Sequence, residues 1–119
     1  KLARNTGNLM VITGVLHLLL GIVEHQKALL EIWQLGIINT VDRNLEMFGF
    51  FWFEINGLLV VFTGALIQHY INEHKKQIPK RFGWYLLAIA VFGCLLEPLS
   101  GFYVYVLISA IIIKLKVSF

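Results

Sequence analysis

The feature that most constrains this chain is a set of four long apolar stretches that carry almost no charge. They lie at residues 9–23, 47–69, 82–97 and 99–113. Hydrophobic residues make up 58% of the 119 residues and charged residues 14%, whereas soluble domains carry roughly 25% charged residues. Too little polar surface remains to coat a soluble globule. The sequence therefore predicts a chain that lies in a lipid bilayer.

The four stretches are expected to be helices. In lipid the backbone must satisfy its own hydrogen bonds, which leaves helices or a closed barrel. The alternation of barrel strands is absent, and four stretches are too few for a barrel. We therefore predict an all-α fold in which residues 1–119 form one integral membrane four-helix bundle. At about 1.5 Å per residue the second stretch is ~34 Å long, and the others are ~23–24 Å.

The basic residues predict how such a bundle is oriented. Of the 10 Lys and Arg residues, eight precede the first stretch, separate the second from the third, or follow the fourth. Only Lys27 and Arg43 lie in the first connection. By the positive-inside rule, both termini of this multi-pass protein are expected in the cytoplasm. The formal charge of +3 thus reflects topology, and nucleic acid is not an expected partner.

The connection between the first two stretches is long and partly amphipathic. Between residues 24 and 46, apolar residues alternate with Lys27, Glu31 and Gln34 in a pattern too short and too charged to span a membrane. It suits an interfacial or re-entrant helix on the outer side. Gly36 is expected to end that helix, and residues 39–42 to turn into a capped start of the second stretch. Ser100 is expected to cap the fourth.

Small and polar residues recur at heptad-like spacing along each stretch. Small residues let membrane helices approach closely, and polar residues turn inward because lipid cannot solvate them. These positions therefore predict the faces along which the helices pack. The faces are Met10, Gly14, His17, Gly21, Glu24 and His25; Phe50, Glu54, Gly57, Val61, Gly64 and Gln68; Gly83, Leu87, Ala90, Cys94 and Glu97; and Gly101, Tyr105 and Ser109.

Three ionisable residues on these faces are the candidate site. His17 lies seven residues before Glu24 and Glu54 lies seven residues after Met47, so both are expected about 10 Å below the outer surface. Glu97 ends the third stretch near the same side. We expect these residues to form an outer-half polar pocket that binds a small molecule or a proton. The expected ligand-binding residues are His17, Glu54, Glu97, Asn56, Tyr103 and Tyr105.

Each candidate also has a purely structural interpretation. His17 and Asn56 can serve as hydrogen-bonding contacts between helices, and Glu97 can be an interfacial residue beside Pro98. Glu54 is harder to explain, because a carboxylate at that depth costs about 2–3 kcal/mol on insertion scales. It must either carry a proton or pair with a cation such as protonated His17. Other ionisable residues at the membrane boundaries are ordinary solvated side chains: Glu24, His25, His69 and His74.

Other site chemistry finds little support. The Glu-x-x-His pairs of di-iron bundles are absent, so no metal site is predicted. The single cysteine, Cys94, lies within an apolar stretch, and Ser100 and Ser109 have no matched base. We assign no catalytic residue and no cofactor, and an enzyme is the less favoured class.

Three segments resemble a known family. They are residues 14–21 with Gly14-Val15-Leu16-His17, residues 51–64 with Phe51-Trp52-Phe53-Glu54, and Pro98-Leu99-Ser100-Gly101-Phe102-Tyr103. They look like a family of small bacterial four-helix membrane proteins catalogued as a domain of unknown function. The resemblance implies a bacterial inner membrane protein and transfers no site residue. In architecture the chain is also similar to DoxX-like proteins, which implies a link to quinone-dependent oxidation.

Three functions follow as expectations. The favoured one is binding or transport of a small molecule or proton in the polar pocket, with a homo-oligomer supplying a path if transport occurs. The alternative is an accessory or scaffolding subunit of a larger membrane complex. The third is a component of a quinone-linked membrane oxidoreductase. All three share the lipid bilayer as a partner.

Overall fold

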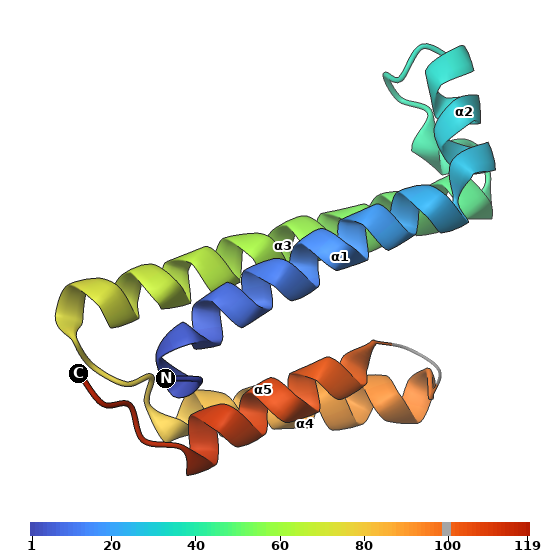
Figure 1. Cartoon of the computed structure of the whole chain (residues 1–119). Coiled ribbons are helices and arrows are strands. Elements are labelled where there is room, and N and C mark those ends of the chain that lie inside the picture. The colour runs from blue at the N-terminus through green and yellow to red at the C-terminus, as the bar shows by residue number, and fades with distance from the viewer. Residues whose placement is uncertain (99–100) are drawn as a thin grey trace. The chain divides into compact units, whose positions relative to one another are not determined.

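The computed structural model describes residues 1–98 and 101–119, and in this part of the chain the secondary structure is helical with no strand (Figure 1). The predicted all-α fold is confirmed, and each of the four apolar stretches forms a helix. The predicted start of the fourth helix at residue 99 and its Ser100 cap lie outside the described residues. The helices are α1 (Thr6–Glu24), α2 (Gln26–Gln34), α3 (Leu45–His74), α4 (Lys80–Leu96) and α5 (Phe102–Lys114), with short 3-10 turns at Ala3–Asn5 and Val41–Arg43.

Two of the described helices are long and apolar enough to cross a membrane. They are Ala3–Glu24, which joins the first 3-10 turn to α1, and α3, which is 30 residues long. α5 is apolar but shorter, with 13 residues. The coarse prediction of membrane-length helices therefore holds for α1 and α3. A membrane bundle of four helices remains a prediction.

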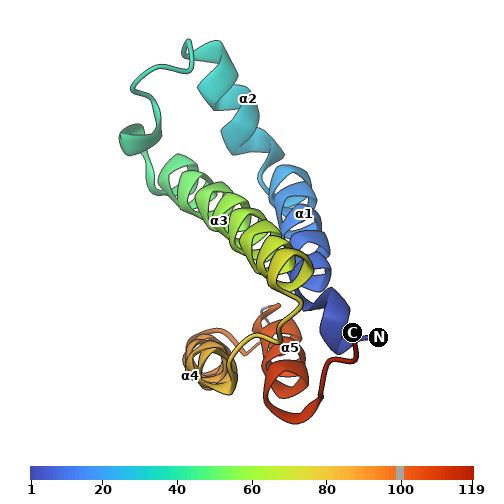
Figure 2. The ribbon, with the colours of Figure 1, turned by 90° about the vertical axis from the view of Figure 1, so that its left-hand side faces the viewer.

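The chain divides into two compact units, residues 12–62 and residues 1–11 with 63–119. In the first of these, α1 and α3 run antiparallel and side by side (Figures 1 and 2). A Cβ atom on Gly14 would lie 2.8 Å from the backbone nitrogen of Val61, and one on Gly57 would lie 2.9 Å from the His17 ring. Glycine at these two positions thus lets the helices touch at backbone distance.

The amphipathic helix predicted in the first connection is present as α2. It ends at Gln34 with Leu35 as its C-cap, one residue before the predicted Gly36, which follows with a φ of +92° that favours glycine. The N–H groups of Gly36 and Ile37 bond back to Trp33 and Ile32, which is a Schellman motif. The turn that follows leads to Asn44, whose Oδ1 accepts a hydrogen bond of 2.8 Å from the Met47 N–H and caps α3.

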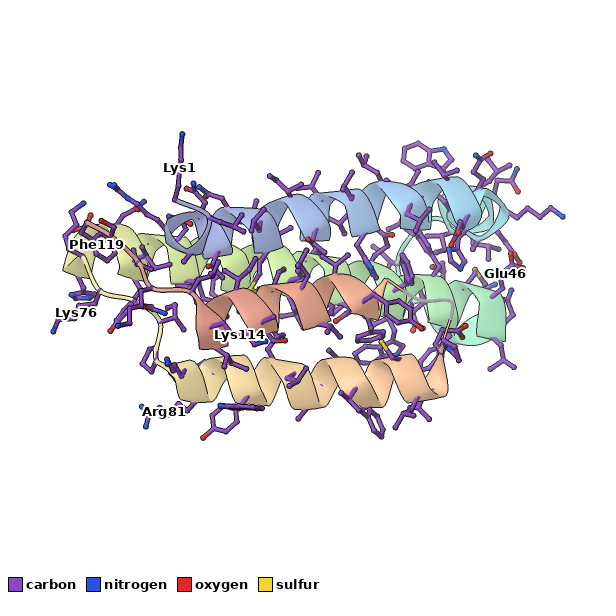
Figure 3. All side chains as sticks on the ribbon, turned by 60° about the horizontal axis from the view of Figure 1, so that its bottom comes forward. Lys1, Glu46, Lys76, Arg81, Lys114 and Phe119 are labelled. Atoms are coloured by element: carbon purple, nitrogen blue, oxygen red, sulfur yellow. The ribbon has the colours of Figure 1, made fainter. Side chains whose placement is uncertain are left out.

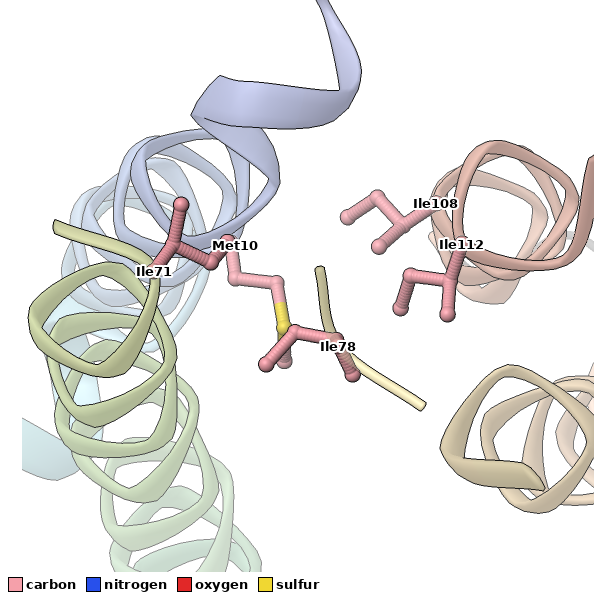
Figure 4. Close-up of a cluster of buried hydrophobic side chains, with 5 residues drawn as sticks. All are labelled: Met10, Ile71, Ile78, Ile108 and Ile112. Atoms are coloured by element: carbon pink, nitrogen blue, oxygen red, sulfur yellow. The ribbon is translucent and has the colours of Figure 1, made fainter. Parts of the chain in front are cut away.

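The second unit contains α4, α5 and the ends of α1 and α3. Its core is a cluster of buried side chains from α1, α3, α5 and the connection that precedes α4 (Figure 4). α4 and α5 pack closely because Gly83 and Gly93 lack side chains: a Cβ on Gly83 would meet Ile113 at 2.7 Å, and one on Gly93 would overlap the Phe102 ring. The clustered residues are Met10, Ile71, Ile78, Ile108 and Ile112.

Gln68, which lies on the predicted packing face of the second stretch, joins α3 to the start of α1. It is only 8% exposed. Its Oε1 accepts a hydrogen bond of 3.0 Å from the Asn8 N–H, one of the N–H groups that the first turn of a helix leaves without a partner. Its Nε2 donates to the Arg4 carbonyl at 3.0 Å and to Asn72 Oδ1 at 3.1 Å. One buried amide thus satisfies backbone groups of two segments.

We expect Gln68→Leu to lower the free energy of unfolding by about 1–3 kcal/mol, because it leaves the Asn8 N–H and the Arg4 carbonyl without this partner. The measurement is reversible unfolding in mixed detergent micelles, followed by circular dichroism. The neighbouring His69 is exposed, so His69→Leu serves as the control and should change stability by much less. Equal losses in the two variants would contradict a bonding role for Gln68.

Candidate functional site

The candidate site lies on α1 and α3 within residues 12–62, and Glu54 is its central residue. The Oε1 atom of Glu54 is buried and has no hydrogen-bond partner among the described residues. It lies directly against Gly21 of α1, where a Cβ atom would overlap it and would also lie 2.7 Å from the Phe53 ring. The missing side chain of Gly21 therefore makes the space that this carboxyl oxygen occupies.

His17 lies beside Glu54 and is held by Phe53. The imidazole stacks on the Phe53 ring with centroids 3.8 Å apart and planes 13° from parallel. Its Nε2 lies 2.9 Å from the Phe53 carbonyl oxygen. Because a carbonyl can only accept, Nε2 must carry hydrogen, and Nδ1 is the ring nitrogen that can gain or lose a proton.

His25 approaches the same site from the end of α1. Its Nδ1 lies 3.1 Å from the Gly21 carbonyl oxygen, so Nδ1 is the donor and Nε2 is the nitrogen left to exchange a proton. The ring lies 5.5 Å from that of Phe53 and 5.8 Å from that of Phe50, measured between centroids. These contacts fix the ring at the junction of α1 and α2.

Both imidazoles interact electrostatically with the Glu54 carboxylate. Each has one nitrogen tied to a backbone carbonyl and a second nitrogen that can exchange a proton. A carboxyl oxygen without a hydrogen-bond partner is costly in an apolar setting unless it gains a proton or a cationic partner. The arrangement can therefore store a proton on Glu54 or share one with either histidine.

The other predicted site residues are placed differently. Asn56 is exposed and lies two residues from Glu54, about 200° around α3 at 100° per residue. Glu97 is the exposed C-cap of α4, and its N–H bonds to the Gly93 carbonyl. Tyr103 is exposed, whereas Tyr105 packs against the core cluster and lies 5.7 Å from the Phe102 ring. The last three belong to the other unit, so their convergence with His17 and Glu54 remains a prediction.

A model of one protein family, described as a family of unknown function (DUF6463), matches residues 1–118. The chain belongs to this family. The predicted resemblance to a family of unknown function is therefore confirmed, and nothing found shows a relationship of DUF6463 to DoxX-like proteins. No curated protein and no solved structure matched the chain.

Two site residues of this DUF6463 chain were missed from its sequence. The sequence predicts an ordinary boundary residue at His25 and no site role for Phe53. A signal for His25 was present, since it lies eight residues after His17 and thus about two helical turns further along the same face. Phe53 offered no such signal, because stacking depends on how two helices are rotated against each other.

The described part of this DUF6463 chain contains no group of three or more His, Cys, Asp or Glu side chains arranged to hold a metal ion. Cys94 is a free thiol. The groups that the site does offer are one carboxyl and two imidazoles, and the chemistry they share is the binding and release of protons.

Proposed function

We propose that this chain is a small integral membrane protein that binds a proton or a small molecule between α1 and α3, with Glu54 as the principal acceptor. The observation that supports this most is the buried Glu54 Oε1, which has no hydrogen-bond partner among the described residues and lies near two imidazoles. A buried carboxyl group inside a membrane helix is costly and commonly functional.

Membrane insertion is supported by the surfaces of α1 and α3. Both helices reach the length needed to cross a bilayer. Their outward faces carry large apolar side chains, such as Leu16 and Phe62, each 60% exposed, and Leu58, 54% exposed. Soluble proteins rarely expose continuous surfaces of this kind, whereas acyl chains cover them without cost.

The orientation with cytoplasmic termini is supported by the distribution of charge within the second unit. Figure 3 labels Lys1, Lys76, Arg81 and Lys114, and these four lie toward the same end of that unit. It is the end at which α4 begins and α5 finishes. Basic residues gathered at one end are retained on the cytoplasmic side of a membrane.

A proton suits the site better than a larger ligand. Gly21 lies directly against the Glu54 carboxyl, and the stacked rings of His17 and Phe53 occupy the neighbouring space. A proton needs no cavity. It binds a carboxylate oxygen and converts the ion to a neutral carboxyl group, which removes the cost of a buried charge. His25, at the junction of α1 and α2, is placed to take up or release the proton.

We expect Glu54→Gln to abolish proton uptake by the site, because the amide cannot titrate. The measurement is infrared difference spectroscopy of the protein in vesicles across a pH step, which resolves the carbonyl band of a newly protonated carboxyl group. Glu46 on the first turn of α3 is exposed, so Glu46→Gln is the matched control and should keep the band. A band that persists unchanged in Glu54→Gln would contradict the proposal.

A second candidate, an accessory subunit of a larger membrane complex, is favoured by the surface of α4. One side of this helix forms a shallow, open depression lined almost wholly by apolar side chains, against which a helix of another subunit would pack. Co-purification of a partner in mild detergent supports this function, and a solitary monomer argues against it. The lining residues are Trp84, Leu87, Ala88, Val91, Phe92 and Leu95.

A quinone-linked role stays a prediction that depends on the architectural similarity to DoxX-like proteins. Its test is solvent extraction of the purified protein followed by a search for quinone. Stoichiometric quinone supports the role, and its absence removes the basis for it.

A further inference from the structure

α2 carries apolar side chains that no part of residues 12–62 covers. Its inner side is well packed, since Ala28 is 1% exposed and clusters with Met47 and Phe50 at the start of α3. Away from this packed side of α2, Leu30 is 57% exposed and Trp33 is 71% exposed. α2 therefore uses only part of its apolar surface to pack onto its own unit.

Three of the four polar residues of α2 occupy a separate side. At 100° per residue, Lys27, Glu31 and Gln34 fall within one arc, whereas Leu29, Leu30 and Trp33 fall outside it, as does Gln26 in the first turn. The Glu31 carboxylate accepts weak hydrogen bonds of 3.4 and 3.5 Å from Asn44, which caps α3. α2 is thus an amphipathic helix whose polar side is attached to the returning chain and whose remaining apolar side is open.

The direction of α2 relative to α1 and α3 indicates how it would lie at a membrane. The chain turns at His25, whose φ of −115° and ψ of 35° are not helical. Figures 1 and 2 show that α2 then runs across the direction of α1 and α3 within the same unit. If α1 and α3 cross the bilayer, a helix that runs across them at their ends lies along the membrane surface.

We propose that α2 lies in the boundary between headgroups and acyl chains, on the side where α1 ends and α3 begins, with Leu29, Leu30 and Trp33 inserted into the lipid. This inference rests on the membrane location in the proposed function. Apolar side chains are also exposed near the adjoining ends of the two spans, with Val23 of α1 at 63% and Phe48 of α3 at 46%. One lipid surface covers all of them, and tryptophan is enriched at this depth.

The test measures the depth of Trp33. The chain has 3 Trp residues, so Trp52→Phe with Trp84→Phe leaves Trp33 as the only indole. The protein is reconstituted into phosphatidylcholine vesicles whose lipids carry a nitroxide at a shallow or a deep acyl position, and acrylamide is added as an aqueous quencher. We expect a larger loss of Trp33 fluorescence with the shallow nitroxide than with the deep one, and a small loss with acrylamide.

Three results would overturn the inference. Quenching by acrylamide alone would place α2 in water, quenching by neither reagent would mean that protein covers Trp33, and stronger quenching by the deep nitroxide would make the segment re-entrant. A second variant that keeps only Trp52, on α3, distinguishes failure of the α2 inference from failure of the proposed function. If lipid nitroxides quench Trp52 but not Trp33, only the α2 inference fails; if they quench neither, the membrane location fails as well.

Two substitutions that each add a glutamate, one on the apolar side of α2 and one on its polar side, test the orientation of the helix. Leu30→Glu, made in the protein that retains only Trp33, should reduce shallow quenching and increase acrylamide quenching, because a carboxylate resists entry into lipid. Gln34→Glu lies on the polar side and should leave both unchanged. Equal effects from the two substitutions would contradict the assigned orientation.

Discussion

Gly64→Ala is expected to destabilise the protein although alanine is the better helix former. A Cβ atom at Gly64 would lie 2.7 Å from the Val11 backbone nitrogen and 2.8 Å from the Gly7 carbonyl oxygen. Backbone atoms of a helix cannot move aside like the tip of a flexible side chain, so α1 and α3 must separate. Overpacking of this kind costs about 1–3 kcal/mol, and we expect a loss of this size in the free energy of unfolding.

Gly49→Ala provides the matched control on the same helix. No atom lies within 4 Å of a Cβ built at Gly49. The substitution there should leave stability unchanged or raise it by up to about 1 kcal/mol, because alanine loses less backbone entropy than glycine in a helix. Reversible unfolding in mixed micelles measures both variants. A Gly64→Ala protein as stable as Gly49→Ala would mean that α1 and α3 do not meet at this glycine.

Gly21→Ala is expected to act on the site through Glu54. The new Cβ would overlap Glu54 Oε1 and crowd the Phe53 ring, so the carboxyl must leave its position and the stacked His17 is disturbed. In a Glu54→Ala background the first overlap no longer exists. Gly21→Ala should therefore cost less there than in the native chain, with a coupling energy of about 0.5–3 kcal/mol between the two positions.

A double-mutant cycle of unfolding free energies measures this coupling, and the infrared band of Glu54 in the single Gly21→Ala variant provides a second readout. We expect that band to shift or disappear, because the carboxyl group changes its surroundings. Additive effects in the cycle, together with an unchanged band, would show that Glu54 does not lie against Gly21.

Much of the secondary structure could be predicted because its causes are local. Gly36 ends α2 since glycine tolerates a positive φ, and Pro79 precedes α4 because its missing N–H costs little there. The packing face of α1 was predicted for a similar reason. Glycine at 14 and 21 recurs with heptad spacing on one side of the helix, and both positions are buried in the structure.

The candidate site was predictable only in part. His17 and Glu54 were identifiable because an ionisable residue in an apolar stretch is costly wherever it points. Asn56 was a candidate because it is polar, yet it lies on the exposed side of α3. Polarity alone does not fix the rotation of a helix, and at Glu54 that rotation is coupled to the contact with Gly21.

The sequence by itself determined the all-α class of this protein and its candidate site residues, since apolar length and glycine spacing are properties of single segments. Only the tertiary structure decided which atoms meet. The pairing of Gly21 with Glu54, the stack of His17 on Phe53 and the approach of His25 depend on the register between α1 and α3. A register is set by the joint packing of two distant segments, and neither segment encodes it alone.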